Sequence, residues 1–107
     1  MLKLTTQYIT KIYVGEAQNQ PRDLQIQHIE QWAKAWAIGS YTLIDGRGYW
    51  YNGNKQITEK TTIIEIISDF KMRITNRELT DLVLRTNQEA LLVTRQTIDT
   101  ELITQGD

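Results

Sequence analysis

The chain has 107 residues, the size of one domain, and its 40% hydrophobic and 23% charged residues are an ordinary globular composition. With 12 basic residues, 13 acidic residues and a formal net charge of -1, it lacks the positive surface that binding to a phosphate backbone requires, which argues against nucleic acid as a partner. It has no cysteine, which excludes disulfides and thiolate metal sites. Neither a signal core nor an apolar run of membrane-spanning length is present, so we expect a cytoplasmic protein that spans no membrane.

The first half of the chain predicts a strand, a helix and a second strand. Residues 8–14 alternate and are rich in β-branched and aromatic side chains, which indicates a strand. Residues 21–36 form the first predicted helix, because Pro21 suits a first helical turn and apolar residues recur at helical spacing after it. Residues 41–45 regain β character, and the glycines within 46–54 are typical of a strand that ends in a loop.

The second half predicts a strand, a helix and a final strand. Residues 61–67 read Thr-Thr-Ile-Ile-Glu-Ile-Ile, the clearest strand signal in the chain. Thr75 and Glu78 have the spacing of a capping box, which places the second helix at residues 76–86. Residues 90–94 form the fourth predicted strand, and 98–103 a short edge strand. The order is that of a single α+β domain over residues 1–107.

The predicted sheet is apolar on both faces, although two helices can cover only one face of four strands. Ile63 and Ile67 point to one side of the third strand, whereas Ile64 and Ile66 point to the other. Burying the uncovered face against other copies is favourable, by about 25 cal/mol per Å² of apolar surface. We therefore expect a closed homo-oligomer; the alternative is that C-terminal residues fold back over this face. The fourth strand repeats the pattern, with Ala90 and Leu92 against Leu91 and Val93.

Familiar catalytic and cofactor motifs are weak here. His28 is the only histidine and is best interpreted as a solvated helix residue, since no zinc site or Ser-His-Asp set can be assembled around it. Gly46-x-Gly48 lacks the third glycine of a dinucleotide fingerprint. Trp32 and Trp36, one turn apart, are interpreted as core or subunit contacts. We expect no metal and no cofactor.

The glycines do allow a ligand to approach the backbone closely, beside the aromatic residues Tyr49, Trp50 and Tyr51. Aromatic side chains next to accessible amides suit a planar base such as adenine. Gly48, Tyr49 and Trp50 are therefore candidate binding residues. The structural alternative is a twisted hairpin whose aromatic side chains pack on the sheet.

Three further polar residues are candidates. Glu59 precedes the third strand and Gln88 the fourth, so these strand ends can meet within a subunit or across an interface. The alternative for Glu59 is a solvated ion pair with Lys60. Glu65 shares a face with Ile63 and Ile67, and an unpaired buried carboxylate is costly, so it is either a partnered interface residue or a site residue.

The element order and the stretch of residues 39–48 resemble the PII-like proteins. That family implies a ferredoxin-like β-α-β-β-α-β sandwich, with an antiparallel sheet and both helices on one face. It also implies a trimer that binds adenine-containing ligands in clefts between subunits. The stretch between the second and third strands is shorter here than the long regulatory loop of true PII proteins, and fold alone does not give function.

Within this group, Thr58-Glu59-Lys60-Thr61 and the run from Gln88 to Val93 are similar to the corresponding pieces of phage enzymes that degrade S-adenosylmethionine. The resemblance implies that Glu59 is the functional carboxylate, that Gln88 comes from a neighbouring subunit, and that the backbone around Gly48 and Tyr49 borders the substrate. The intervening residues diverge. Two hypotheses follow: a lyase acting on S-adenosylmethionine, or a PII-like protein that senses or sequesters an adenine-type molecule by moving its 46–60 loop.

Overall fold

The computed structural model describes residues 4–17, 19–69 and 73–106. Its six elements follow the predicted order of strand, helix, strand, strand, helix, strand, which confirms the ferredoxin-like α+β fold. They are β1 (Leu4–Val14), α1 (Arg22–Ala35), β2 (Thr42–Asn52), β3 (Lys55–Ser68), α2 (Asn76–Arg85) and β4 (Leu92–Glu101).

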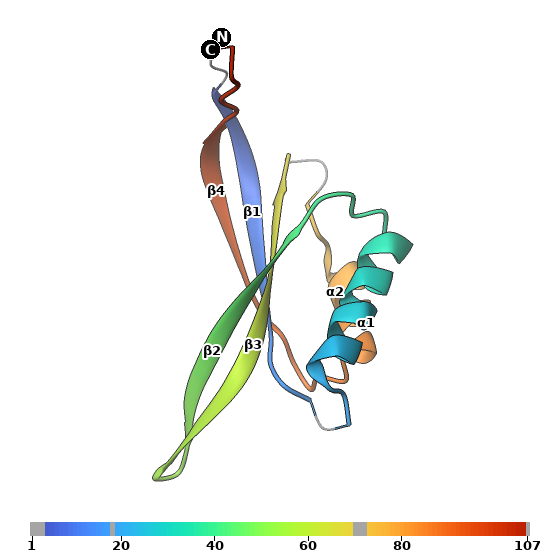
Figure 1. Ribbon diagram of the computed structural model, residues 1–107, viewed down its shortest axis with the longest axis vertical. Coiled ribbons are helices and arrows are strands. Elements are labelled where there is room, and N and C mark those ends of the chain that lie inside the picture. Colours follow the sequence, from blue (N-terminus) through green and yellow to red (C-terminus); the bar gives the residue numbers. More distant parts are fainter. Residues whose placement is uncertain (1–3, 18, 70–72, 107) are drawn as a thin grey trace.

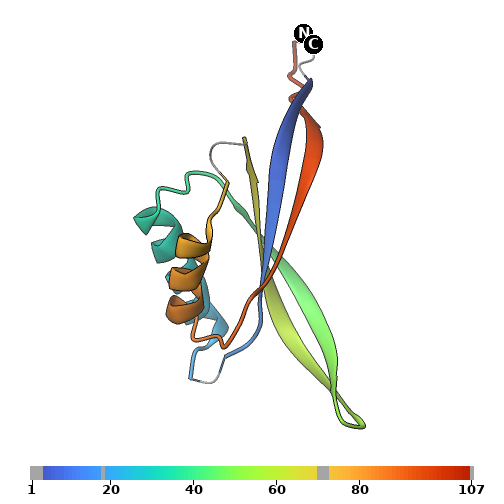
Figure 2. The same cartoon turned by 180° about the vertical axis from the view of Figure 1, so that it is seen from behind.

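The four strands form one sheet in the order β2-β3-β1-β4, and all three neighbouring pairs are antiparallel. The two central strands, β1 and β3, are paired so that Ile12 lies opposite Ile64. Both helices lie against the same face of this sheet, as the two opposite views show (Figure 1, Figure 2). The other face of the sheet, which we call the open face, has no helix over it.

The core lies between the helices and the even-numbered residues of the central strands. Because side chains alternate along a strand, these residues all point to the covered face. The indole of Trp32 is fully buried, and its Nε1 donates a hydrogen bond to the Glu78 carbonyl at 2.8 Å, which confirms Trp32 as a core residue. The buried apolar residues are Ile12, Val14, Ile29, Trp32, Ala33, Ile64, Ile66, Ile74, Leu79 and Leu82.

The second helix begins as the sequence predicts. Thr75 is its N-cap, and the reciprocal capping box with Glu78 is formed. This satisfies backbone N–H groups that have no partner inside the helix. Among the described residues, no helix combines the length and the apolar character that crossing a bilayer requires.

Residues 46–60 are not a loop, which corrects the sequence-based prediction. They belong to a long hairpin in which β2 and β3 pair from Thr42 opposite Glu65 down to Asn52 opposite Lys55. Only two residues connect the strands, and the first, Gly53, has a φ of 65°, which two-residue hairpin turns require at that position. The hairpin projects well below the helices in Figure 1. The hairpin of the structural alternative is thus present, but its aromatic residues do not pack down on the sheet, since Tyr49, Trp50 and Tyr51 are 58%, 47% and 68% exposed.

The outer strands also differ from their predicted lengths. The first strand begins at Leu4 rather than at residue 8, and residues 92–101 form one continuous β4 instead of two short strands. The cause is mutual pairing, since β1 and β4 are in register from Leu4 opposite Glu101 to Tyr13 opposite Leu92. Residues 4–7 and 95–97 are mostly polar and carry no apolar alternation that would signal a strand by itself.

The open face is partly apolar in the single chain, as predicted. Residues after β4 do not fold back over it, because Leu102 and Ile103 remain 75% and 71% exposed. That alternative is therefore wrong for the described chain. The pairing register places the following exposed apolar residues on the open face: Ile44, Trp50, Ile67 and Leu92.

Candidate functional site

A hollow of about 580 Å³ lies where three segments meet: the turn after β1, the β2–β3 hairpin, and the turn between α2 and β4. It brings together Glu59, Gln88 and Trp50, three residues that the sequence singles out from two separate regions. Its lining residues are Glu16, Ala17, Trp50, Glu59, Asn87, Gln88, Glu89 and Ala90.

Glu59 lies on β3 and points to the open face, opposite Gly48 of β2. Its carboxylate occupies the space beside Gly15, where an added Cβ would lie only 2.7 Å from Glu59 Oε1. An added Cβ at Gly48 would lie 3.5 Å from Glu59 Cγ and 2.9 Å from Thr61 Oγ1. Both glycines therefore leave room for side chains of β3. At Gly48, the atoms that come closest to the backbone belong to the protein itself and not to a ligand.

Gln88 follows α2 and is fixed by backbone contacts. Its Nε2 donates to the Gly15 carbonyl at 3.0 Å and to the Thr86 carbonyl at 3.3 Å. The Gly15 carbonyl also accepts a hydrogen bond from Gln25 Nε2 at 2.8 Å. Gly15 is thus the point at which Glu59 and Gln88 converge within one chain. A neighbouring subunit is not needed to bring them together, and its contribution stays a prediction.

The three consecutive aromatic residues do not form one cluster. Side chains alternate along β2, so Trp50 points to the open face with Ile57, whereas Tyr49 and Tyr51 point to the other side. Trp50 lines the hollow and is 47% exposed, which leaves its indole available to a ligand. Tyr49 is 58% exposed and does not line the hollow.

Glu65 lies outside the hollow, six positions along β3 from Glu59 on the same open face. Its neighbours in the register are Lys11 on β1 and Thr42 on β2. It is half-buried in the single chain. Glu65 can therefore contact a ligand in the hollow only if other copies of the chain cover the open face, and this stays a prediction.

The hollow is acidic. Three carboxylates line it, Glu16, Glu59 and Glu89, and no Lys or Arg does among the residues that the structure describes. Glu16 is held in place because one of its carboxylate oxygens accepts a hydrogen bond from the Lys60 backbone N–H at 2.6 Å. Within the described ranges, no three His, Cys, Asp or Glu side chains are close enough together to hold a metal ion.

Glu16 is the lining carboxylate that sequence reasoning misses. It lies in the polar segment after β1, and nothing in that segment's pattern separates it from its neighbours. Only the hydrogen bond to Lys60, 44 positions away, shows that it borders the same hollow as Glu59. Glu89 is signalled only by its position next to Gln88 at the start of the final strand region.

No family model matches this sequence, and neither does any curated protein. The fold, however, matches solved structures. A phage SAM lyase in complex with S-methyl-5'-thioadenosine superposes with a TM-score of 0.56 at 17% identity, over 92% of this chain and 91% of that chain. CPII, a nitrogen regulatory PII-like protein from Thiomonas intermedia K12 bound to ADP, AMP and bicarbonate, matches with a TM-score of 0.58 at 10% identity, over 92% and 96% of the two chains.

CutA1 from Oryza sativa matches with a TM-score of 0.63 at 6% identity, over 87% of this chain and 80% of that chain. Identities this low show the fold alone. The chain therefore has a PII-like, ferredoxin-type fold, as the sequence resemblance predicts.

Proposed function

We propose that this protein is an S-adenosylmethionine lyase that converts its substrate to methylthioadenosine and homoserine lactone. The acidic hollow is the main support for this function, because Glu59 and Gln88 converge there on Gly15, beside Trp50. The shared fold with a SAM lyase bound to S-methyl-5'-thioadenosine supports it.

The reaction needs no protein nucleophile. The substrate's own carboxylate attacks its γ-carbon, the bond between that carbon and sulfur breaks, and the electron pair goes to sulfur. The products are a neutral thioether and a lactone, with no change in oxidation state. The protein has only to fold the substrate into attack geometry, and such positioning can contribute about 7–11 kcal/mol in favourable intramolecular cases.

The carboxylates give the hollow a preference for cations. S-adenosylmethionine carries a positive sulfonium, and a unit charge about 6 Å from a carboxylate gains on the order of 3 kcal/mol at an effective dielectric constant of ~20, but under ~1 kcal/mol in bulk water. In this proposal Glu59 anchors the cationic part of the substrate and Gln88 holds its polar end. Trp50, rather than Tyr49, provides the aromatic face for the adenosine or the sulfonium.

The second candidate function is a PII-like sensor that binds an adenine nucleotide without turnover. The fold match to CPII bound to ADP and AMP favours it. The three carboxylates of the hollow argue against this second function, because they repel the phosphates of a nucleotide. In this reading the signal has to be carried by the β2–β3 hairpin, since residues 46–60 are paired strands and not a loop.

We also propose that the protein works as a homotrimer. The apolar residues of the open face have no covering segment in the described chain, and burying them between copies would place Glu65 and the hollow at or near subunit interfaces.

Turnover tests the proposed function. Purified protein incubated with S-adenosylmethionine should release methylthioadenosine, detected by chromatography. Glu59→Gln removes the negative charge at nearly constant volume and should reduce the rate at least about 100-fold, a loss of about 2.7 kcal/mol of transition-state stabilisation. The matched control is Glu30→Gln on the exposed side of α1, which should retain the wild-type rate.

Two results would decide against this assignment. If the wild-type protein forms no methylthioadenosine but binds ADP tightly, the sensor function is favoured. If Glu59→Gln turns over as fast as the wild type, Glu59 has no part in the reaction.

A further inference from the structure

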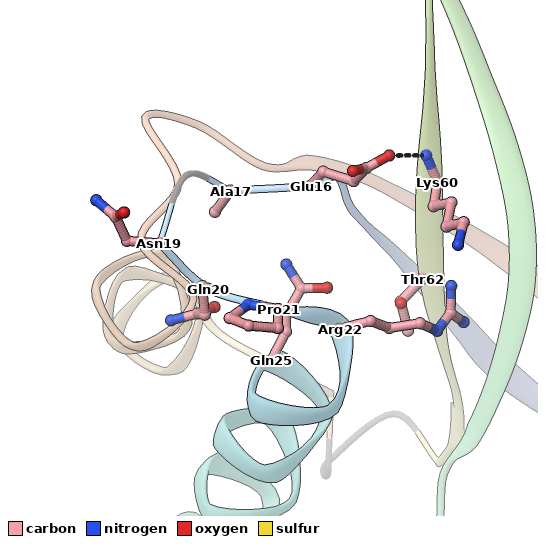
Figure 3. Close-up of a pocket in the computed structure, with 9 residues that line it drawn as sticks. All are labelled: Glu16, Ala17, Asn19, Gln20, Pro21, Arg22, Gln25, Lys60 and Thr62. Atoms are coloured by element: carbon pink, nitrogen blue, oxygen red, sulfur yellow. Dashed lines mark hydrogen bonds between the residues drawn. The ribbon is translucent and has the colours of Figure 1, made fainter.

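A second cavity, of about 310 Å³, lies where β3, the turn after β1 and the start of α1 meet (Figure 3). Lys60 and Thr62 face the helix-covered side, whereas Glu59 faces the open side, because neighbouring residues on a strand point in opposite directions. The cavity is closed by the turn after β1 and by the first turn of α1. Its lining residues are Glu16, Ala17, Asn19, Gln20, Pro21, Arg22, Gln25, Lys60 and Thr62.

Two cationic side chains reach the same end of this cavity. Figure 3 shows Arg22 and Lys60 extending toward Thr62 from α1 and β3. The Arg22 guanidinium is paired with Asp45, a residue whose side chain is 82% exposed. A guanidinium has five N–H donors, so this contact leaves others available. The Lys60 ammonium has no ion pair with any residue in the described part of the chain.

The Thr62 hydroxyl borders the cavity and has no hydrogen-bond partner in the described chain. Thr62 is only 1% exposed as a residue, although its hydroxyl oxygen stays accessible from the cavity. The buried side-chain polar atoms that lack a partner do not include this hydroxyl, so it is open to the cavity and free to bond to a ligand or to solvent. Figure 3 shows this hydroxyl directed into the cavity.

The remaining polar wall offers acceptor oxygens: Gln20 Oε1 is buried without a partner, while its Nε2 donates to the Arg85 carbonyl at 3.1 Å. Gln25 is 4% exposed and is anchored through Nε2 to the Gly15 carbonyl, which leaves its Oε1 available as an acceptor. Glu16 also borders the cavity, but one of its carboxylate oxygens is already engaged by the Lys60 backbone N–H. The Lys60 ammonium therefore has no carboxylate partner in the described chain, whereas Arg22 is paired with Asp45.

We propose that this cavity binds a compact oxyanion, a carboxylate or phosphate group of a small molecule, between Arg22 and Lys60. The anion accepts hydrogen bonds from both cations and from the Thr62 hydroxyl, and Gln25 Oε1 accepts from any hydroxyl that the ligand carries. The volume is at the lower end of the range for small-molecule sites, so it has room for a small molecule that carries such an oxyanion. This cavity shares Glu16 and Ala17 with the acidic hollow, its other lining residues are different, and the proposal does not depend on the lyase assignment.

The test is a titration of the full chain with inorganic phosphate and with malonate, followed by ¹H–¹⁵N NMR spectra. Sodium chloride at matched ionic strength is the reference. We expect saturable shifts at the amides of Arg22, Lys60 and Thr62 that the chloride series does not reproduce. Saturation by phosphate alone, or by malonate alone, supports the site and identifies which oxyanion it takes. Absence of saturable shifts with both, or identical shifts with chloride, overturns the proposal.

Variants locate the binding. Lys60→Gln should weaken binding of the anion at least about tenfold. Thr62→Val, which keeps the side-chain shape, should weaken binding by a factor of about three or more. Lys55→Gln, which removes an exposed cation at the hairpin turn, should leave the affinity unchanged within about twofold. Equal weakening by Lys55→Gln and Lys60→Gln would indicate nonspecific charge attraction and would also overturn the proposal.

Discussion

Gly15 is the residue on which the geometry of the candidate site depends most. Its carbonyl accepts hydrogen bonds from both Gln88 and Gln25, and its missing side chain leaves the space that the Glu59 carboxylate fills. The glycine matters here for the space it leaves, so a small side chain at this position should disturb the site more than the fold.

Replacement of Gly15 by alanine tests this role. The new Cβ would lie 2.7 Å from Glu59 Oε1, so the end of the Glu59 side chain must move while the backbone can stay. We expect binding of a substrate analogue to weaken about tenfold, with thermal stability changed by no more than about 0.5 kcal/mol. Affinity is measured by calorimetry and stability by circular dichroism.

The control for this change is Gly39→Ala, because an added Cβ at Gly39 meets no atom within 4 Å. It should bind the analogue as the wild type does. Unchanged affinity in Gly15→Ala would show that the position of the Glu59 carboxylate does not determine binding.

At the scale of elements, a polar network joins the two helices on their outer side. Trp36 Nε1 donates to Asp81 Oδ2 at 2.8 Å, and Arg85 Nε donates to the same oxygen at 2.7 Å. The Arg77 guanidinium lies 5.9 Å from the centroid of the Trp36 ring. The hydrogen bond from Trp36, followed by that from Arg85, lowers the pKa of Asp81 below its ordinary value of 3.8.

This lowered pKa predicts a pH-dependent contribution to stability. Because the folded protein favours the ionised form of Asp81, the contribution is fully present above a pH of about 3.8 and is lost as the pH falls through the lower folded pKa. Asp81→Asn should therefore be less stable than the wild type by about 1 kcal/mol at neutral pH, and the difference should shrink toward about pH 2.

Thermal unfolding of the two proteins across this pH range measures the effect, with Glu30→Gln as a control that should follow the wild type. If Asp81→Asn lowers the free energy of unfolding by the same amount at neutral pH and at about pH 2, ionisation of Asp81 does not stabilise the packing of the two helices.

Local patterns in the sequence predict the helices and the central strands well. The capping box at Thr75 and Glu78 and the alternating isoleucines of β3 are short-range signals, and the structure confirms both. The main prediction places a loop where the long hairpin lies, because Gly46 and Gly48 suggest a break in the strand. Their role is set by the partner strand, since Cβ atoms there would contact Ile63 and Thr61. The sequence likewise singles out Glu59 and Gln88, whereas Glu16 joins them only through long-range contacts.

At the scale of the whole molecule, the open face determines how the chain behaves in solution. Ile67 and Leu92 are 44% and 65% exposed there, and the described residues after β4 cover neither. Apolar patches of this kind mark contacts with other molecules. The wild-type protein should therefore sediment at micromolar concentration with about three times its chain mass of 12.5 kDa.

Ile67→Lys tests which surface assembles. A lysine is tolerated at this partly exposed position of a single chain, but it would be buried between copies, so the variant should sediment as a single chain. The matched control is Leu84→Lys on the outer side of α2, where the residue is 75% exposed, and it should assemble normally. If the wild type sediments with the mass of a single chain, the proposed trimer is wrong.

We expect the acidic hollow to select a cation, and calorimetry on three adenosine ligands tests this claim. The ligands are sinefungin, in which an ammonium group replaces the sulfonium and cannot be cleaved, the neutral thioether S-adenosylhomocysteine, and the anion ADP. Wild-type protein should bind sinefungin at least about tenfold more tightly than the thioether, and it should bind ADP most weakly. In Glu59→Gln, the difference in affinity between sinefungin and the thioether should fall to about threefold or less. Equal affinity for the cation and the thioether, or tighter binding of ADP, would contradict the claim.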